Sequence, residues 1–410
     1  MNIVIIGAVW PEITSSAAGL RHQNLIDFFL KENWKVTYLS SSKTNEHTEH
    51  LNQQGVKTLP IELNCSSFND IIKNISPDVV IFDRFITEEQ FGWRVHQVCP
   101  NCVHILDTQD LHFLRNCRKK ALELNTSLDD IASAKISFDM DFTYRELASI
   151  LRSDLCLMIS DFEYDLLINQ FKIPKEILTL LRFSYDNIAE QPSFEQRNHY
   201  SMIGNFRHAP NADSIHWFSK EIWPNIRKQL PTAEVHIYGA YPPKEFTSMS
   251  NPDIGFLVKG WTPNQMETLK KYRVNLAPLR FGAGIKGKIS DSWFAGTPSV
   301  TTQIGAEGMY ENLPFGGEIT NCSNEFIQKA VSIYQNSNQW SLLQKNGFDI
   351  LKNLYNFETN KNSIIRAIVD LKNNIKSFRH KNIYRNILFH HTLQSSKYLS
   401  KWIEEKNKLK

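Results

Sequence analysis

The stretch Arg280-Phe-Gly-Ala-Gly-Ile-Lys-Gly-Lys-Ile-Ser-Asp-Ser-Trp-Phe-Ala-Gly-Thr-Pro298 lies between two apolar runs, Val274–Leu279 and Ser299–Thr302, that are typical of buried strands. Its first half is rich in glycine and its second half has the apolar residues of a short helix. A glycine-rich turn that leads into a helix offers free backbone N–H groups at the positive end of the helix dipole, which suits a phosphate. The pattern predicts a strand, loop, helix, strand unit with a candidate phosphate site. An ordinary loop with solvated lysines is the alternative.

The same alternation of short apolar runs and helical stretches extends through both halves of the chain. Strand candidates in the first half are Asn2–Ile6, Lys35–Leu39, Asp78–Phe82, Val103–Leu106, Leu155–Ile159 and Ile177–Leu181. Those in the second half are Ser201–Ile203, Glu234–Tyr238, Gly255–Val258, Val274–Leu279, Ser299–Thr302 and Glu318–Thr320. Continuous apolarity predicts strands that are covered on both faces, and strand–helix–strand order with short connections predicts parallel pairing.

A polar stretch with little periodicity separates the two alternations, and a chain of 410 residues is too long for one core. We therefore predict an α/β fold of two Rossmann-like, doubly wound domains that face each other across a cleft. Residues 1–184 form the first domain, 185–199 the linker and 200–358 the second domain. The remaining helices, 359–410, are predicted to pack back on the first domain.

Two helical stretches carry more detailed expectations. Ser127 to Arg152 is predicted to be a long helical insertion in the first half. In the second half, the helix that begins near Asn211 has one apolar stripe, and Pro224 is expected to kink it or restart it.

Composition and charge bound the class of protein. Apolar residues make up 41% of the chain, charged residues 22%, and the net charge is +3, which argues neither for nor against nucleic acid. Met1–Trp10 is typical of a first strand rather than a signal peptide, and the six scattered cysteines suit a reducing compartment. We predict a cytoplasmic protein. The basic stretch from Lys372 to Lys410 leaves open a peripheral contact with the inner face of a membrane.

Two loops of the first half lie at predicted strand ends. The loop from Gly7 to Gly19 lacks the Gly-x-Gly-x-x-Gly fingerprint, which disfavours an oxidoreductase, but its small residues allow a substrate to approach the backbone. Asp107-Thr-Gln-Asp110-Leu-His112 brings acids and an imidazole to the presumed cleft, where His112 could move a proton or hold a hydroxyl. Equally, Asp107 or Thr108 could only cap the next helix.

The second half opens with another strand, glycine loop and helix start, Gly204-Asn205-Phe-Arg207-His-Ala-Pro-Asn211. Arg207 is expected to face the same sheet edge as Lys286. Arginine and lysine can neutralise a diphosphate leaving group without a metal. The sequence has no cluster of side chains with metal-ligand spacing, so we predict neither a metal nor a cofactor.

Five segments of the second half together resemble a known family. They are Gly204–Asn211, Val235-His-Ile-Tyr-Gly239, Gly260-Trp-Thr-Pro263, Ala277-Pro-Leu-Arg280 and Gly282 through Gly308. In this order they resemble the family-4 retaining glycosyltransferases (glycosyl transferases group 1) of the two-domain GT-B fold. The first half resembles the acceptor domain of that family more loosely, through the Gly7–Gly19 and Asp107–His112 loops.

The resemblance implies roles for individual residues of the donor site. Asp291 occupies the second position of the family's Glu-x7-Glu pair, which holds the ribose hydroxyls, whereas Ala283 replaces the glutamate that touches the donor sugar. The diphosphate would lie along Gly284, Lys286 and Lys288, with Arg207 opposite. Asn205 belongs to the same set, Trp261 would flank the base, and Glu307 would contact the donor or its ribose.

On the acceptor side, the resemblance implies that His112 assists catalysis and that the loops with Gly19, Asp107 and Asp110 hold the acceptor. The implied reaction moves a sugar, with retention and without a metal, from a nucleotide-diphosphate donor to a glycan, lipid-linked or other hydroxyl acceptor, as in polysaccharide biosynthesis. Two alternatives stay open. One is a non-catalytic sugar-nucleotide-binding subunit, consistent with Ala283, and the other is a nucleotide-sugar epimerase or hydrolase of the same fold.

Overall fold

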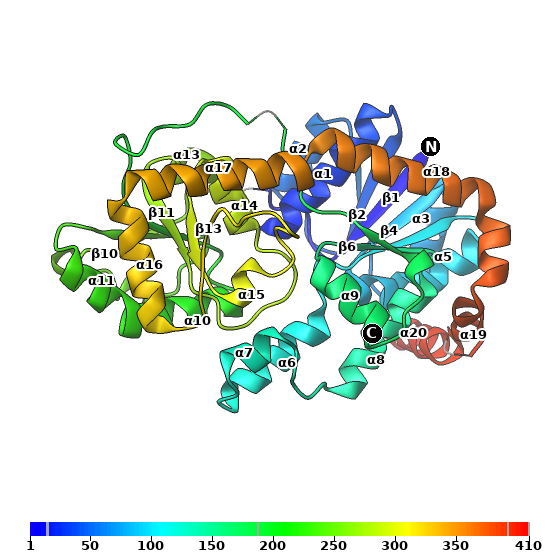
Figure 1. Cartoon of the computed structure of the whole chain (residues 1–410). Coiled ribbons are helices and arrows are strands. Elements are labelled where there is room, and N and C mark those ends of the chain that lie inside the picture. Colours follow the sequence, from blue (N-terminus) through cyan, green and yellow to red (C-terminus); the bar gives the residue numbers. More distant parts are fainter. Residues whose placement is uncertain (14–15, 187, 392, 409–410) are drawn as a thin grey trace.

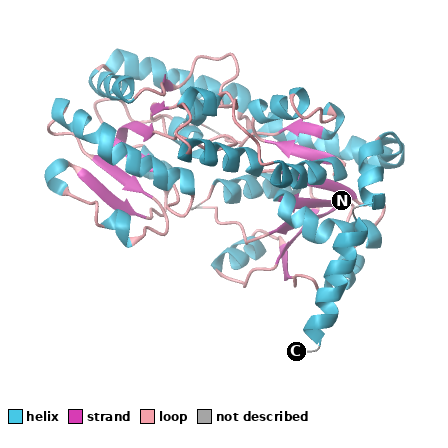
Figure 2. Cartoon of the chain, turned by 90° about the horizontal axis from the view of Figure 1, so that it is seen from below, coloured by secondary structure: helices cyan, strands magenta, loops and turns pink. Residues whose placement is uncertain are grey.

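The computed structural model describes the whole chain except residues 14–15, 187, 392 and 409–410 (Figure 1). Its described residues form two parallel sheets that lie side by side, each flanked by helices (Figure 2). The strand order is β3-β2-β1-β4-β5-β6-β7 in the first sheet and β10-β9-β8-β11-β12-β13 in the second. Both orders reverse direction once, as in doubly wound folds. The predicted fold class is therefore confirmed.

The first sheet consists of β1 (Asn2–Gly7), β2 (Lys35–Ser40), β3 (Lys57–Pro60), β4 (Val79–Asp83), β5 (Val103–Asp107), β6 (Leu155–Met158) and β7 (Leu178–Leu180). Its helices are α1 (Ala17–Lys31), α2 (Glu46–Gln53), α3 (Ser67–Ile75), α4 (Arg84–Thr87), η1 (Glu88–Gly92), α5 (Trp93–Val98), α6 (His112–Glu123), α7 (Leu128–Ala132), α8 (Met140–Arg152), α9 (Asp161–Asn169) and η2 (Lys175–Ile177). Every pairing between these strands is parallel, as expected from their short crossover connections.

The second sheet consists of β8 (Asn198–Ile203), β9 (Val235–Tyr238), β10 (Phe256–Gly260), β11 (Tyr272–Ala277), β12 (Ser299–Thr301) and β13 (Gly317–Ile319). Its helices are α10 (Ala209–Trp217), η3 (Phe218–Ile222), α11 (Trp223–Gln229), α12 (Lys244–Thr247), η4 (Pro252–Ile254), α13 (Gln265–Leu269), α14 (Gly287–Phe294), α15 (Gln303–Ala306), α16 (Ser323–Gln335) and α17 (Ser337–Leu354). These strands are also paired in parallel.

The core of the first domain has two layers because successive strand residues face opposite sides of the sheet. Val4 and Ile6 of β1 belong to one buried cluster with side chains of α3, α5, α6 and α8. Ile3 and Ile5 belong to the other, with side chains of α1 and of α18 (Phe357–Lys381). The long helix α18 thus completes the first domain after the chain has passed through the second (Figure 1).

The last helices, α19 (Ile383–His391) and α20 (Leu393–Lys408), lie against the first domain. Arg379 and Arg385 contact the carboxylate of Asp154 at 2.5 Å and 3.0 Å, and Arg94 contacts Glu404 at 3.0 Å. Within the described residues, no helix has both the length and the apolarity needed to cross a bilayer.

Local details of the structure refine or differ from the predictions. The edge strand β3 was not expected, because Lys-Thr-Leu-Pro is short and only partly buried. The predicted helical insertion from Ser127 to Arg152 consists of two helices, α7 and α8, with a non-helical segment between them. The predicted strand Val274–Leu279 ends at Ala277, before Pro278. Pro224 does restart the helix: it lies in the first turn of α11, directly after the π-helical turn η3.

Candidate functional site

The candidate site lies at the carboxyl edges of the strands. In a doubly wound sheet, ligands bind where the strand order reverses. In the second sheet this point lies between β8 and β11, and in the first sheet between β1 and β4. The loop after β11 carries Gly282 to Lys286, which we name the donor loop, and it leads directly into α14.

Lys286 is folded back on the donor loop. Its ammonium donates hydrogen bonds to the carbonyl oxygens of Ala283, at 3.3 Å, and Gly284. The side chain is buried, and this burial lowers the pKa of its ammonium. Gly284 has φ +64°, which favours glycine, and its position is crowded by the first domain: a Cβ there would lie 2.9 Å from the Cβ of Asp110.

Lys288 lies at the start of α14 and points across to the loop after β8. Its Nζ donates to Oδ1 of Asn211 at 2.6 Å. A Cβ on Gly204 would lie 2.8 Å from this Nζ, so the missing side chain of Gly204 makes room for the lysine. Burial, with a smaller contribution from Lys286, lowers the pKa of Lys288 to about 7. Two lysine ammonium groups, one buried and one half-buried, lie close enough for each to interact with an anionic ligand at this loop.

The other predicted donor residues lie on the neighbouring loops. The Oδ1 atom of Asn205 accepts the backbone N–H of Arg207 at 2.9 Å, which orders the loop after β8. The exposed guanidinium of Arg207 lies 3.8 Å above the ring of Tyr241. Trp261 follows β10 and is 53% exposed. These two side chains are therefore accessible at the same sheet edge as the lysines.

Asp291 is buried inside α14 and has a partner at each carboxylate oxygen. The hydroxyl of Tyr185 donates to Oδ1 at 2.6 Å, and the amide of Gln265 donates to Oδ2 at 2.5 Å. Burial raises the pKa of Asp291 to about 7, although both hydrogen bonds act in the opposite direction.

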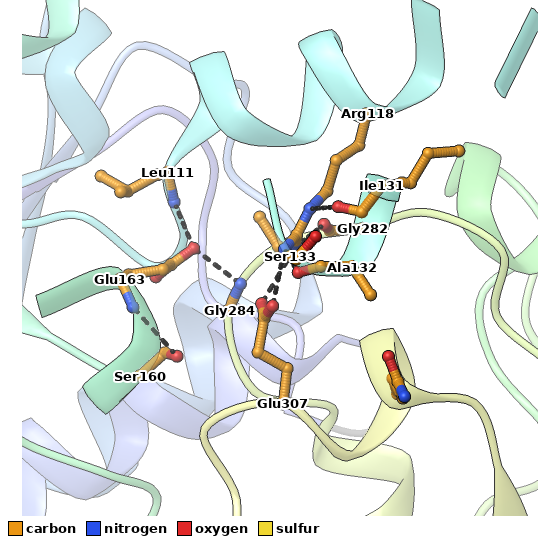
Figure 3. A network of polar contacts seen from close by, with 12 residues as sticks. Leu111, Arg118, Ile131, Ala132, Ser133, Ser160, Glu163, Gly282, Gly284 and Glu307 are labelled. Atoms are coloured by element: carbon orange, nitrogen blue, oxygen red, sulfur yellow. Dashed lines mark hydrogen bonds and ion pairs between the residues drawn. The ribbon is translucent and has the colours of Figure 1, made fainter. Parts of the chain in front are cut away.

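Glu307 is engaged by the first domain rather than being free for a ligand (Figure 3). Arg118 of α6 donates to both of its carboxylate oxygens, at 2.9 Å and 2.6 Å. The same guanidinium also donates to the carbonyl of Gly282 at 2.9 Å, and to the carbonyls of Ile131 and Ala132. One fully buried arginine thus joins the donor loop to the first domain.

A second buried side chain of the first domain holds the donor loop. Glu163 of α9 accepts the N–H of Gly284 at 2.8 Å and the N–H of Leu111 at 2.9 Å through the same oxygen (Figure 3). Burial is the main reason that the pKa of Glu163 is raised to about 7. Arg118 and Glu163 together fix the two glycines that flank Ala283.

The start of α6 places His112 in this interface. Glu146 of α8 accepts the N–H groups of His112 and Phe113, at 3.1 Å and 2.8 Å, and so caps the helix from outside. Burial raises the pKa of Glu146 to about 8. The alternative in which Asp107 or Thr108 caps this helix is wrong, because the first-turn N–H groups are taken by carboxylates of other helices.

Asp107 instead anchors α1. Its carboxylate accepts Nε of the buried Arg21 at 2.6 Å and the amide of Gln109 at 2.9 Å. The Thr108 hydroxyl donates to the carbonyl of Leu157. The carboxylate of Asp107 is therefore buried and engaged by Arg21 and Gln109.

Asp110 and His112 form a charged group with Arg115. Nε2 of His112 lies 3.3 Å from Oδ1 of Asp110, whose other oxygen contacts Arg115. Burial tends to raise the pKa of Asp110, but Arg115 and His112 outweigh it and lower that pKa to about 2. Burial lowers the pKa of His112 to about 4, so the imidazole is neutral near pH 7 and can accept or donate a hydrogen bond.

A pocket of about 170 Å³ opens at the reversal point of the first sheet. It is lined by Trp10 of the loop after β1, by Gly19 in the first turn of α1, by Asp83 at the end of β4 and by Arg84 directly after it. A Cβ on Gly19 would lie 2.3 Å from the carbonyl oxygen of Glu12, so glycine lets this loop pack on α1. The predicted acceptor-side residue Gly19 thus shapes the wall of a real pocket.

Several site residues were not expected from the sequence. Arg118, Glu163 and Tyr185 lie more than 100 positions from the donor-loop and α14 atoms that they contact. Gln265 could have been suspected as a site residue, because it follows the predicted Gly260–Pro263 turn in the sequence. Among the described residues, no group of three or more His, Cys, Asp or Glu side chains has a geometry that could hold a metal.

Comparison with known proteins finds one family model that matches part of the second domain. Residues 197–336 match the family model described as Glycosyl transferases group 1. This part of the chain is therefore similar to the group 1 glycosyltransferases. No curated protein sequence matches the chain.

Solved structures agree with the GT-B fold over both domains. Sucrose-phosphate synthase from Thermosynechococcus elongatus has a TM-score of 0.68 and 12% identity, covering 90% of this chain and 98% of that one. The pneumococcal O-GlcNAc transferase GtfA, solved with UDP and GlcNAc, has a TM-score of 0.67 and 11% identity, covering 90% and 99%. TarM from S. aureus has a TM-score of 0.68 and 9% identity, covering 90% and 98%. At these identities the GT-B chain shares the fold with all three.

Proposed function

We propose that this GT-B chain is a glycosyltransferase that moves a sugar from a nucleoside-diphosphate donor to a hydroxyl acceptor, with retention and without a metal or other cofactor. The observation that carries the proposal is a pair of lysines, the buried Lys286 and the half-buried Lys288, at the reversal point of the second sheet. A diphosphate there would replace the carbonyl and amide partners that these ammonium groups now have. The cationic site would stabilise the charge that develops on the leaving group.

The remaining donor contacts follow from the arrangement around the lysines. Asp291 would accept the ribose hydroxyls, and the exposed faces of Trp261 and Arg207 would flank the base and the phosphates. Ala283 offers no carboxylate to the donor sugar, so backbone groups of the donor loop would provide that contact. The neutral imidazole of His112 would hold a hydroxyl of the sugar or the acceptor, beside Asp110.

The acceptor would enter from the first domain, through the pocket beside Gly19 and Arg84. In the retaining reaction proposed here, the acceptor hydroxyl attacks on the face from which the diphosphate leaves. A phosphate oxygen takes the hydroxyl proton, the new glycosidic bond forms and the bond from the sugar to the phosphate breaks. The substrates of this reaction are a nucleotide sugar and a glycan or lipid-linked acceptor. Polysaccharide biosynthesis on the cytoplasmic side of a membrane is the process that such acceptors would serve.

One experiment tests the reaction class. Purified protein is incubated with UDP-, GDP- and ADP-sugars, with and without hydroxyl acceptors, and nucleotide release is followed. Release that requires an acceptor is the expected result, with unchanged rates in EDTA and with a retained anomeric configuration in the product by NMR. Formation of a new nucleotide sugar would indicate an epimerase instead. Donor binding without turnover would indicate a binding subunit.

We also propose that the C-terminal helices contact an anionic membrane surface. Ile383, Tyr384 and Ile387 of α19 are exposed, as are Tyr398 and Trp402 of α20, next to several lysines. Residues at i and i+4 share a helix face, so Ile383 and Ile387 lie on one exposed face of α19, and Tyr398 and Trp402 lie on one exposed face of α20. Co-sedimentation with phosphatidylglycerol vesicles is expected, and it should weaken in Trp402→Ala. Equal binding to phosphatidylcholine vesicles would contradict the electrostatic part of the proposal.

A further inference from the structure

The two crossovers between the domains are joined to each other at Tyr185. The chain enters the second domain through the segment that begins at Ser184 and returns through residues 355–357. The N–H of Tyr185 donates to the carbonyl of Tyr355 at 2.8 Å, and the N–H of Phe357 donates to the carbonyl of Tyr185 at 3.2 Å. Tyr185 and Asn356 form an isolated parallel bridge. Tyr185 is therefore fixed from its backbone.

The side chain of Tyr185 reaches from this crossover into the second domain. Its ring stacks on Phe294 of α14, with 5.2 Å between the ring centroids. Its hydroxyl lies 2.6 Å from Oδ1 of Asp291 and 2.8 Å from Oγ of Ser290. The Tyr185 hydroxyl has one proton and two acceptors, Oγ of Ser290 and Oδ1 of Asp291, of which the carboxylate oxygen is the nearer and accepts the stronger hydrogen bond.

Asp291 is in this way clamped from two sides. Tyr185 holds Oδ1 and Gln265, from the start of α13, holds Oδ2 at 2.5 Å. Each oxygen of a carboxylate can accept two hydrogen bonds, so each retains a lone pair. The clamp fixes the direction in which these lone pairs point. A short aspartate side chain depends more on such a clamp, since it reaches less far toward a ligand than glutamate does.

We propose that Tyr185 is a positioning residue that, through Asp291, sets the recognition of the ribose diol of the donor nucleotide. The inference rests on the proposed function, which brings a nucleoside diphosphate to Asp291. A ribose offers two neighbouring hydroxyl donors, which match the two oxygens of a carboxylate whose orientation is fixed. A 2′-deoxyribose offers one. The ligand class that this site would select is thus a ribonucleoside diphosphate over its 2′-deoxy counterpart.

The chain supplies a matched pair of variants for the test. Tyr185→Phe removes the hydroxyl on Asp291 and keeps the ring on Phe294. Tyr355→Phe removes a hydroxyl from the other crossover, where it donates to the carbonyl of Met309 at 3.0 Å. Both tyrosines are buried. Tyr185→Phe loses the contacts with Asp291 and Ser290, and Tyr355→Phe loses the contact with Met309. Only the first loses a contact with the carboxylate.

The measurement is calorimetric affinity of the full chain for UDP, GDP and ADP, each beside its 2′-deoxy form. The wild type is expected to prefer the ribonucleotide of its own base by about tenfold, the value of one good hydrogen bond to a charged group. Tyr185→Phe should lose most of that preference, whereas Tyr355→Phe should keep it. If Tyr185→Phe does not fold, Gln265→Leu replaces it, since it releases the other oxygen and should lower the same ratio.

The outcomes separate this inference from the function on which it rests. A wild type that binds none of the three nucleoside diphosphates overturns the proposed donor. A wild type that binds one of them without preferring ribose, or a Tyr185→Phe variant with the wild-type ratio, overturns the role of Tyr185 and leaves the donor site standing. A loss of preference that is equal in both tyrosine variants would show a structural effect of the crossover and would also overturn it.

Discussion

At the scale of single residues, Lys288 links burial to donor affinity. Its folded-state pKa of about 7 means that the free protein carries the ammonium below pH 7 and loses it above. A bound diphosphate would hold the proton on. We therefore expect kcat/KM for the nucleotide sugar to fall as pH rises through 7, while kcat changes less.

Replacing the lysine sharpens this prediction. Lys288→Met should lower kcat/KM by about 10²-fold, the usual loss when one stabilising charge is removed, and should flatten the fall above pH 7. Lys270→Met is the control, because Lys270 forms a surface pair with Glu267 on α13. A Lys288→Met profile that keeps the wild-type break near pH 7 would assign that break to another group.

Glu146 makes stability depend on pH in the opposite sense to an ordinary salt-bridged acid. Its pKa is about 8 in the fold, well above the ordinary value of 4.5, so the folded state keeps a proton that the unfolded chain has released. Between about pH 5 and pH 8, each unit of rising pH removes about 1.4 kcal/mol of stability through this one group. The guanidinium chloride concentration at which half of the protein is unfolded should therefore be lower at pH 8 than at pH 6.

The contribution of Glu146 is isolated by Glu146→Gln, which retains an acceptor oxygen but does not titrate. Its midpoint should change less between pH 6 and pH 8 than that of the wild type, because the other titrating groups are common to both proteins. Glu123→Gln, at the exposed end of α6, should follow the wild-type curve. Parallel curves for all three proteins would mean that Glu146 is ionised in the fold.

At the scale of elements, the contact between α6 and the second domain includes the ion pair of Arg118 with Glu307. Arg118→Met leaves Glu307 without its partner in the domain interface, which is more costly than losing the pair altogether. We expect kcat/KM to drop by about 10²-fold in Arg118→Met and by less in Glu307→Gln. The double variant should be no worse than Arg118→Met, since the two side chains act together. Steady-state kinetics of the four proteins measures this coupling, and additive losses would refute it.

Strand positions could be predicted from the sequence because most buried parallel strands contain short apolar runs, and twelve of the described strands overlap a predicted strand. Lys57–Pro60 does not, since an edge strand needs no apolar run. The donor loop could be placed for the same reason, as it follows a buried strand. Arg118 and Glu163 could not, because a charged residue on a helix gives no sign of which distant backbone it contacts. The contacts of Arg118 and Glu163 with the second domain form only when the two domains are packed against each other.

At the scale of the whole molecule, two glycines of the second domain lie directly against the first domain. Gly284 faces Asp110 and Gly308 faces Ser160, where an added Cβ would lie 2.2 Å from the serine hydroxyl oxygen. Both have positive φ, at +64° and +70°. Gly308 follows the ion-paired Glu307, so the interface around the donor loop tolerates no extra atom at this position.

Gly308→Ala should therefore hold the domains apart without removing a donor contact. With nucleoside diphosphate present, small-angle scattering should give a larger radius of gyration than for the wild type, and kcat should fall more than the affinity for the nucleotide, since closure completes the site. Gly55→Ala is the matched control: Gly55 also has positive φ, +86°, but no atom within 4 Å of an added Cβ. It should share the backbone strain and keep the wild-type scattering. If both variants scatter like the wild type, the glycine contact does not limit closure.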